Sequence, residues 1–580
     1  MEKLIDLVKE RPLLYDNRNV DFKYREKRLE GWNEIAQIMG KEDGNFWRFK
    51  WNCLKENYSK YKKVNFNPSH QIYKKYRNWP WGERMKFMDN IPNKRKDFIK
   101  VFKFSSYSRQ PEQSFSSAQK CIGQPTHYTH PHLLKSNEIT PMITTKEYQN
   151  RRAKLIENIN QFNTIKNQGK HFMVVIPSAS KKYMSDKIPY VFRQNTEFLY
   201  LTGCQEPDSC LVLINNDSDQ FTSVLFVQGK DAHTELWDGP RVCPSTVNEF
   251  FGVDQGFPMK ELENYLQRNS KSKKELQLWY DVMSPVQENV HNVMENILKQ
   301  KKNFMDSPKT FIDQLRLIKS PAEIELMKKS CQIASEAIIT TIKSSFPGIN
   351  EHEINAKVDY ECRLRGAQYL AYPPVVAGGR RANIIHYITN NQIVTDKEMV
   401  LMDAGCEYHG YSSDITRTWP IEGRFTKEQR ELYDVVLETQ KEIIGLCKNL
   451  PPLDSLFDSM CKILGKKLQE IGLIPKSLTG TSLFKAAYKF CPHHVSHYLG
   501  MDVHDTPSIT RNIPIRPGMI VTVEPGIYVQ DNNESVPKEY RGIGIRIEDD
   551  VLITADGPEV LTDCCPKEVD DILKISSKTH

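Results

Sequence analysis

The stretch MVLMDAGCEYHGYSSDITRTWP, residues 399–420, decides the fold class of the C-terminal half of the chain. An apolar run ends at Asp403, a glycine-containing segment reverses the chain direction, and Asp414 returns on the expected partner strand. This order of residues is typical of an antiparallel strand pair. It therefore predicts two carboxylates that face one point.

Two later stretches end apolar runs on carboxylates in the same way. In IVTVEPG, residues 520–526, the last strand residue before the proline is Glu524. In GIRIEDD, residues 544–550, the alternation of a strand places Arg546 and Glu548 on one face. Both stretches predict an acidic side chain on an otherwise apolar strand.

Burying these acids requires compensating positive charge, because an uncompensated buried carboxylate costs several kcal/mol. Arg546 and Arg417 can neutralise part of it, and metal ions can supply the rest. The potential metal ligands, in chain order, are Asp403, Asp414, His497, Glu524 and Glu548. Each acid alone is typical of a surface or ion-paired residue. Together with one imidazole, they form the oxygen-rich set that suits two divalent cations, and we expect Mn²⁺ before Co²⁺ or Zn²⁺.

The 580 residues are too many for one hydrophobic core and predict several domains. The composition, 39% hydrophobic and 26% charged, is that of a soluble globular protein, and we expect no membrane span. The 13 cysteines are scattered without a Cys-x-x-Cys pair, which is typical of free thiols in a reducing compartment.

Charge is distributed unevenly, although the formal net charge is only +7. Residues 1–92 contain 20 Lys and Arg against 13 Asp and Glu, and residues 93–135 contain 8 against 2. The rest of the chain is mildly acidic. A role in binding nucleic acid or in targeting therefore fits only the first quarter.

Helical periodicity dominates residues 1–92. Two helix faces are predicted by Trp32, Ile35, Ala36 and Met39 and by Trp47, Trp51, Leu54 and Tyr58. The third predicted helix also carries the basic residues Arg48, Lys50, Lys55, Lys60, Lys62 and Lys63. Its basic face could meet phosphates, although a solvated charged face fits the pattern equally well.

Three stretches of this segment resemble the MADF family, which is Myb-like. They are LIDLVKERPLLYDNRNVDFKYREKRLEGWNEIAQIMG (4–40), FKWNCLKENYSKYKK (49–63) and WPWGERMKFMDNIP (79–92). The resemblance implies three helices that bind DNA or partner proteins. We therefore assign residues 1–92 to a MADF-like helical domain with a DNA or protein partner.

The next segment, residues 93–135, changes character. KRKDFIKVFKFSSYSRQPEQSFSSAQK, residues 94–120, is basic, rich in serine and nearly free of acids. We predict a linker here. Its composition is also that of a mitochondrial transit peptide, placed inside the chain.

Residues 136–315 show a mixed α/β pattern without a phosphate-binding glycine loop. The apolar runs HFMVVIP, CLVLIN and SVLFVQG, which begin at His171, Cys210 and Ser223, predict buried strands. We expect an α/β domain here that regulates, shapes substrate access or dimerises.

A new domain starts near residue 316. Ser320 is a predicted helix N-cap, Pro321 takes the first helical position and Glu323 the capping-box position. We assign residues 316–580 to an α+β domain. The expected fold class is thus multidomain, with a small all-α module, an α/β domain and an α+β domain in that order.

Four motifs resemble the pita-bread metallopeptidase family and, within it, the Xaa-Pro aminopeptidases, above all the mitochondrial type of animals. They are AYPPVVAGG (371–379), HHVSHYLGMDVHDTP (493–507), TVEPGIY (522–528) and GIGIRIEDDVL (542–552). The resemblance covers about residues 122–575. It implies a creatinase-like α/β domain before a pita-bread catalytic domain.

The resemblance assigns roles to the five potential ligands. Asp403 would bind one metal, and Asp414 and Glu548 would bridge both. His497 and Glu524 would bind the other. Every position holds a ligand-competent residue, so the sequence does not suggest an inactive relative.

Three histidines, His386, His493 and His504, match the substrate-side histidines of the family. The resemblance implies that they orient the peptide and stabilise the tetrahedral intermediate, although each alone fits a core or surface site equally well. Glu524 is the candidate to pass a proton to the departing proline nitrogen, and His504 or His386 could hold the oxyanion. Arg546 completes the expected catalytic set.

The expected reaction is hydrolysis of the bond between an N-terminal residue and a following proline, including trimming of imported mitochondrial proteins. A metal-activated hydroxide would attack the carbonyl carbon. Proline lacks the backbone N–H that ordinary exopeptidases need, but the preference itself rests on the resemblance. Methionine aminopeptidase chemistry stays open, although those enzymes usually lack the α/β domain. We expect peptide or protein N-termini as substrates, and a homodimer.

Two alternatives concern the chain as a whole. In one, a DNA- or chromatin-binding MADF protein uses the peptidase fold as an interaction surface, although complete metal ligands argue against it. In the other, two neighbouring genes are joined in the sequence, and the enzyme begins near Met85 or Met88 and is mitochondrial. A true fusion would be nuclear or cytoplasmic.

Overall fold

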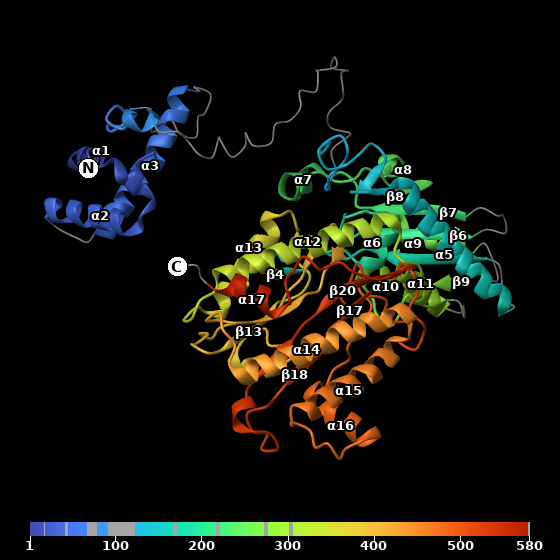
Figure 1. Cartoon of the computed structure of the whole chain (residues 1–580). Helices are drawn as coiled ribbons and strands as arrows, with labels where there is room; N and C mark the ends of the chain where they lie inside the picture. The colour runs from blue at the N-terminus through green and yellow to red at the C-terminus, as the bar shows by residue number, and fades with distance from the viewer. Residues whose placement is uncertain are drawn as a thin grey trace. The chain divides into compact units, whose positions relative to one another are not determined.

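The computed structural model describes nine segments of the chain, which fall into two compact units (Figure 1). The described residues are 1–16, 18–40, 44–66, 78–90, 122–166, 171–215, 221–271, 276–300 and 305–577. The first unit lies within residues 1–114 and the second within residues 115–580. Residues 93–121 of the predicted linker lie outside the described residues.

The first unit is a small group of helices around an aromatic core. Its elements are α1 (Glu2–Lys9), η1 (Pro12–Leu14), η2 (Val20–Lys23), α2 (Arg25–Met39), α3 (Gly44–Phe66) and η4 (Lys86–Asn90). The predicted apolar faces meet here, because Trp32 and Ile35 of α2 belong to one buried cluster with Trp51, Leu54 and Tyr58 of α3. The all-α prediction is confirmed.

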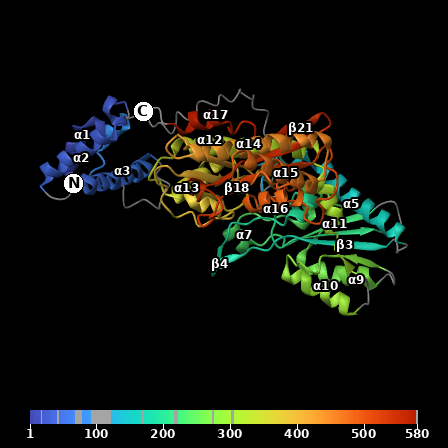
Figure 2. The same cartoon turned by 60° about the horizontal axis from the view of Figure 1, so that its bottom comes forward.

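The α/β domain is built on a six-stranded mixed sheet with helices on both faces (Figure 2). In order across the sheet, its strands are β10 (Met305–Asp306), β9 (Gln277–Trp279), β3 (Phe172–Pro177), β6 (Cys210–Asn215), β7 (Phe221–Val227) and β8 (Gln255–Pro258). The antiparallel neighbours β3, β6 and β7 are the three strands that the sequence predicted.

Alternate residues of the central strands pack into two separate cores. Val174 of β3 packs in a cluster with α5 (Thr145–Ile165) and α11 (Lys309–Leu317). Its neighbour Val175 packs in another with α9 (Leu262–Lys271) and α10 (Glu288–Gln300). Strands covered on both faces are continuously apolar, which explains the sequence pattern. The remaining elements are β1 (Glu138–Thr140), β2 (Ile143–Thr144), β4 (Tyr183–Ser185), β5 (Ile188–Pro189), α6 (Thr196–Thr202), α7 (Ala232–Asp238), η6 (Pro244–Thr246), α8 (Val247–Phe251) and η7 (Met259–Glu261).

Residues 122–135, the C-terminal part of the predicted linker, pack on the α/β domain. Ile122 and Leu134 are buried. The side-chain amide of Gln124 donates to the Gly203 carbonyl at 3.0 Å. The prediction of a linker is therefore wrong for residues 122–135, which pack as part of the α/β domain.

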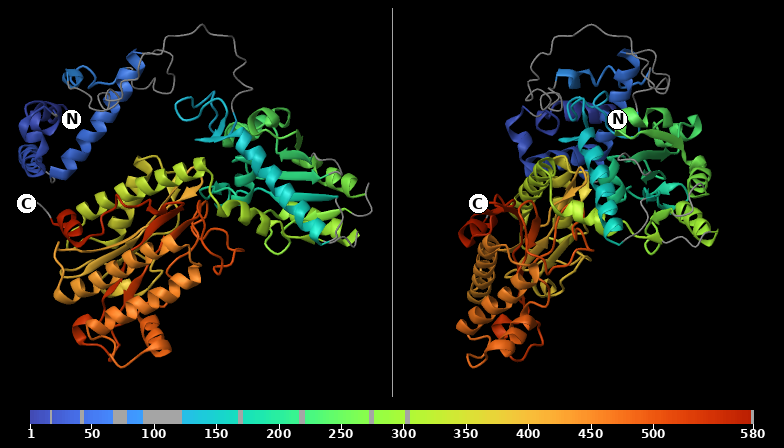
Figure 3. Two further views of the ribbon diagram at one scale, coloured as in Figure 1. Left: turned by 45° about the vertical axis from the view of Figure 1, so that its right-hand side comes forward. Right: turned by 90° about the vertical axis from the view of Figure 1, so that its right-hand side faces the viewer.

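The C-terminal domain has helices on both sides of its strands (Figure 1, Figure 3). α12 (Pro321–Ser344) and α13 (Glu351–Leu364) lie on one side, and α14 (Lys427–Leu446) and α15 (Leu453–Glu470) on the other. α12 begins with the predicted capping box of Ser320 and Glu323. The other helical elements are η8 (Gly379–Asn383), η9 (Cys447–Asn449), α16 (Gly480–Phe490), η10 (Lys538–Tyr540) and α17 (Val569–Ser576).

The strands of this domain form several small antiparallel sheets. They are β11 (Tyr369–Leu370), β12 (Val375–Gly378), β13 (Met399–Asp403), β14 (Cys406–Tyr408), β15 (Tyr411–Ser412), β16 (Thr416–Pro420), β17 (Ile520–Val523), β18 (Gly526–Tyr528), β19 (Gly544–Arg546), β20 (Asp549–Thr554) and β21 (Gly557–Val560). β13 lies between β12 and β16, β20 lies between β17 and β21, and β18 pairs with β19. The predicted fold class of all-α, α/β and α+β parts is confirmed.

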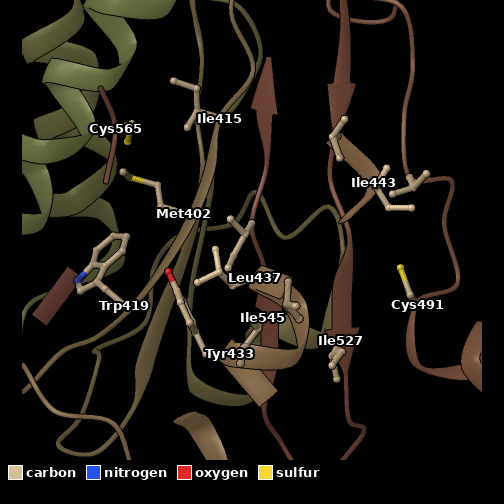
Figure 4. Close-up of a cluster of buried hydrophobic side chains, with 14 of the residues drawn as sticks. Met402, Ile415, Trp419, Tyr433, Leu437, Ile443, Cys491, Ile527, Ile545 and Cys565 are labelled. Carbon is tan, nitrogen blue, oxygen red and sulfur yellow. The ribbon is translucent and has the colours of Figure 1, made fainter. Parts of the chain in front are cut away.

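A large apolar core lies behind the strands that carry the predicted ligands (Figure 4). Met402 of β13, Ile415 just before β16 and Ile545 of β19 all belong to this buried cluster. Side chains alternate between the faces of a strand. Asp403 directly follows Met402, and Asp414 directly precedes Ile415, so both carboxylates are directed away from the core.

Two predictions from composition can be compared with the described part of the chain. Twelve cysteines are described there, and all twelve are free. Among the helices of the described segments, none combines the length and apolarity needed to cross a bilayer.

Candidate metal centre

Strand pairing brings the first two carboxylates together. β13 ends at Asp403, which lies opposite Thr416 in the antiparallel register of β13 and β16. Asp414 precedes β16 by two residues, so its carboxylate belongs to the segment that enters the strand. The predicted chain reversal is present, and the pair of acids lies at one end of this sheet.

Three predicted ligands are in direct proximity. Single ligand atoms of Asp414, His497 and Glu548 all lie within 4.8 Å of one another. His497 Nε2 is 3.5 Å from Asp414 Oδ2 and 3.7 Å from Glu524 Oε1. Glu524 directly follows β17, and Glu548 stands between β19 and β20. The ends of separate strands thus converge on one imidazole.

Asp403 joins the same cluster through hydrogen bonds. The Tyr372 hydroxyl lies 2.5 Å from Oδ1 of both Asp403 and Asp414. Arg546 Nη2 donates to Asp403 Oδ2 at 2.6 Å, and Arg546 Nε donates to the Thr416 hydroxyl at 3.0 Å. The structure therefore places all five sequence-predicted ligands in one cluster, together with Arg546.

Two supporting residues were missed from the sequence. The Thr416 hydroxyl donates to Glu548 Oε2 at 2.6 Å, which orients this carboxylate. Asp550 accepts the Asp414 backbone N–H at 3.0 Å and the Cys331 thiol at 3.2 Å. Asp550 stands beside Glu548 and Asp549 in an acidic run, so the sequence alone did not separate the three roles.

The prediction that Arg417 neutralises the ligand carboxylates is wrong. Arg417 Nη2 donates to Asp549 Oδ1 at 2.7 Å and to the Cys565 carbonyl at 2.8 Å. Thr416 faces Glu548, and strand alternation therefore directs its neighbour Arg417 to the opposite face. Asp549 is the partner of Arg417.

The electrostatics of the cluster show an excess of negative charge. Burial, followed by repulsion from Asp414, raises the pKa of Glu548 well above its ordinary value. Burial likewise raises the pKa of Glu524 to about 7, against the attraction of His497, and raises the pKa of Asp403. Burial would raise the pKa of Asp414 too, but the hydrogen bond from His497 holds it below its usual range.

The positive groups within the cluster are Arg546 and His497. Burial alone would lower the pKa of His497, but Asp414 and Glu524 raise it to about 9. Four carboxylates therefore face one guanidinium and one imidazole. A donor set of this composition fits hard divalent cations, which would supply the missing positive charge.

The three predicted substrate-side histidines surround the cluster. The ring of His504 lies 4.6 Å from that of His497, centroid to centroid. His493 Nε2 lies 2.9 Å from the Tyr528 hydroxyl, and its Nδ1 lies 3.8 Å from Glu524 Oε2. His386 is exposed, and its charge helps to lower the pKa of both other histidines, which places it near them.

Arg546 connects the carboxylates to these histidines. Its Nη1 donates to the Tyr528 hydroxyl at 2.8 Å, and that hydroxyl contacts His493. Burial and then the charge of Arg546 lower the pKa of His493 to about 4. His493 is therefore neutral at pH 7 in this arrangement.

A buried carboxylate anchors the segment that carries His386. Glu351, at the start of α13, is fully buried. It accepts hydrogen bonds from Gly378 N at 2.8 Å, Arg381 Nε at 2.6 Å, Tyr387 Oη at 2.8 Å and Gln392 N at 3.0 Å. One side chain thus fixes both ends of residues 379–392. No sequence pattern singled it out, because its donors come from a loop without periodicity.

A second charged network holds the segment of His504. Arg316 of α11 donates to Asp502 at 2.7 Å and also to Asp505, which Lys319 reaches at 3.2 Å. Arg193 of the α/β domain donates to Asp502 at 3.0 Å. The α/β domain therefore helps to fix the position of a predicted catalytic histidine.

Comparison with known families divides the chain into three parts. Residues 325–555 match Metallopeptidase family M24, and residues 148–279 match the N-terminal domain of aminopeptidase P. Residues 4–88 match a family described as alcohol dehydrogenase transcription factor Myb/SANT-like.

Individual proteins are similar over most of the chain. Xaa-Pro aminopeptidase 3 of Rattus norvegicus is 46% identical over 481 residues, which are 82% of this chain and 94% of the rat protein. The mitochondrial intermediate cleaving peptidase 55 of Arabidopsis thaliana is 38% identical over 451 residues, 78% of this chain and 87% of that protein. The zinc-substituted aminopeptidase P of E. coli in complex with product superposes with a TM-score of 0.68 at 31% identity, covering 75% of this chain and 98% of the E. coli chain.

Proposed function

The chain belongs to the Xaa-Pro aminopeptidases of metallopeptidase family M24, and we infer that it is a metal-dependent enzyme that hydrolyses the bond between an N-terminal residue and a following proline. The observation that carries this function is the convergence of four carboxylates and one imidazole in a single buried cluster. Peptide or protein N-termini are its substrates.

We propose that Asp403 holds one divalent cation, that Asp414 and Glu548 lie between two, and that His497 and Glu524 hold the second. The short distances among these groups and their unbalanced negative charge support this assignment. When bound, such cations lower the pKa of water and polarise a carbonyl group. We propose Mn²⁺ as the native metal, since carboxylates dominate the donor set.

The chain's own residues would handle protons and orient the peptide. Glu524, whose Oε1 lies 3.7 Å from His497 Nε2, would accept a proton and return it to the proline nitrogen. His504 and the exposed His386 would donate hydrogen bonds to the developing oxyanion. His493 and Arg546, linked through Tyr528, would hold the peptide and the carboxylates in register.

A peptide assay tests the function directly. The purified full chain, loaded with Mn²⁺, should release Arg from Arg-Pro-Pro and leave Met-Ala intact. Removal of the metal with a chelator should stop turnover, and Mn²⁺ should restore it. Cleavage of Met-Ala in place of Arg-Pro-Pro would instead indicate methionine aminopeptidase specificity.

We propose that residues 1–92 form a separate binding module for DNA or a protein partner. The Myb/SANT-like match and the positive charge of this segment support the proposal. We retain residues 136–315 and 316–580 as the other two domains, because the three family matches fall within the proposed domains, and limit the proposed connection to residues 93–121, because residues 122–135 pack on the α/β domain.

We propose that the enzyme works in mitochondria, where it trims imported proteins. The similarity to the mitochondrial intermediate cleaving peptidase 55 of Arabidopsis thaliana supports this location. Fractionated source cells can be immunoblotted with antibodies against residues 1–80 and 420–580. One band of 67.4 kDa carrying both epitopes in the nucleus would contradict a mitochondrial location.

We also propose a homodimer. Exposed apolar side chains gather on the β4–β5 hairpin and α7, among them Tyr183, Met184, Leu236 and Trp237. An apolar surface of this kind is typical of an interface. Sedimentation of the full chain tests it, and a monomer at micromolar concentration would contradict it.

A further inference from the structure

The N-terminal helical unit contains a cavity of about 470 Å³. Four of its ten lining residues are aromatic, namely Tyr15, Phe22, Trp32 and Trp51. Cavities of this size and character bind small ligands or single side chains of a partner. The convex backbone of duplex DNA does not fit such a space.

The charged residues that line the cavity in the described part of the chain are all basic. Arg28, Arg48 and Lys55 contribute to the lining, and no described carboxylate forms an ion pair with any of them. The Arg28 guanidinium lies 5.0 Å over the ring of Phe22, and its Nε has no hydrogen-bond partner. Unpaired cations held close together favour an anionic ligand.

A buried donor provides independent support. Trp51 is 1% exposed, and its indole N–H has no acceptor in the described structure. Leaving such a donor unpaired is costly, so a ligand oxygen within the cavity would relieve the cost. Burial and the positive charge of Arg48 both lower the pKa of Lys55. A bound anion would oppose both effects, which also favours an anionic ligand in this cavity.

We propose that this cavity binds an acidic peptide segment of a partner protein. A carboxylate would lie among Arg28, Arg48 and the Trp51 N–H, and an adjacent apolar side chain would pack on Trp32 and Phe22. This rests on the proposal that the helical unit binds a macromolecular partner and specifies the chemistry of that partner.

Fluorescence anisotropy of the full chain tests the proposal. The probes are a labelled 12-residue peptide of alternating acidic and Leu or Phe residues, the same peptide with Asn and Gln in place of the acids, and a 20-base-pair duplex. The acidic peptide should bind about tenfold more tightly than its amide counterpart. Arg48→Glu should weaken it about tenfold, and Trp51→Phe, which retains the ring but removes the donor, about threefold or more.

Lys60→Glu is the matched control, because it makes the same charge change on the same helix away from the cavity lining. It should alter peptide affinity less than about twofold. Equal losses for Arg48→Glu and Lys60→Glu would overturn the cavity proposal in favour of diffuse charge attraction.

DNA binding without peptide binding would overturn the cavity proposal and leave the partner-binding proposal standing, whereas binding of neither would remove both. Unchanged thermal unfolding of the full chain, followed through the tryptophan fluorescence and the helical signal of its circular dichroism, would show that each variant is folded, and if Trp51→Phe fails that check, Arg48→Glu decides.

Discussion

Replacing Glu351 by Gln should loosen the segment that carries His386 and lower turnover. The glutamine retains one oxygen, which will stay with Arg381 and Gly378 because the bond to the guanidinium is charge-assisted. Its NH₂ group then faces the Tyr387 hydroxyl and the Gln392 N–H.

The size of the effect follows from these two donors. The Tyr387 hydroxyl can rotate and accept a hydrogen bond from the new NH₂ group. The Gln392 N–H can only donate, so it loses its acceptor. This hydrogen bond is only partly buried, so its loss costs about 0.5–1.5 kcal/mol, which corresponds to opening of this segment roughly 2- to 13-fold more often.

Hydrogen exchange of residues 379–392 in the full chain measures the opening, and kcat/KM for Arg-Pro-Pro measures its consequence. Glu353→Gln is the matched control, because Glu353 caps the Asn350 N–H at 3.2 Å and glutamine can fill that role. In a His386→Ala background, Glu351→Gln should cause no further loss if it acts by positioning His386. Wild-type exchange rates in Glu351→Gln, or fully additive losses in the double variant, would refute the reasoning.

Three further predictions concern the metal cluster, the domain contact and pH. Asp414→Asn should lower kcat/KM by about a thousandfold or more and reduce bound metal measured by elemental analysis, and full turnover would rule out the proposed ligand set. Arg316→Met should lower the free energy of unfolding by about 1–3 kcal/mol, because the buried Asp505 and the partly exposed Asp502 each lose one of two cationic partners, and an unchanged urea midpoint would count against that network. Burial raises the pKa of Glu206 to about 7, so the folded chain retains a proton that the unfolded chain loses above pH 4.5. Glu206 should therefore contribute a fall in stability of up to about 3 kcal/mol between pH 4.5 and 7, and Glu206→Gln should reduce the wild-type slope by that amount in urea titrations.

The parts of the fold that could be predicted were those with a local signal. The capping box at Ser320 depends only on residues three apart, and an unbroken apolar run predicts the strand β3. The four acidic ligands could be predicted because each interrupts an apolar sequence, where burying a charge costs free energy. They are Asp403, Asp414, Glu524 and Glu548.

The missed residues act through contacts between distant segments. Arg417 and Arg546 look similar in sequence, since each is an arginine on a strand within three residues of a predicted acidic ligand. Only the folded structure shows that Arg417 contacts Asp549 and Arg546 contacts Asp403. Glu351 could not be predicted for the same reason. Its four donors lie in β12, in η8 and in the segment that follows, and no local pattern brings them together.

Asp403 and Arg546 are 143 residues apart in sequence, and this separation affects when the active site forms during folding. Contacts of this kind form late, since most of the domain must collapse before they can close. A half-folded chain therefore possesses none of the assembled cluster and cannot cleave its unfolded neighbours. The peptidase site therefore forms only when folding of its domain is nearly complete.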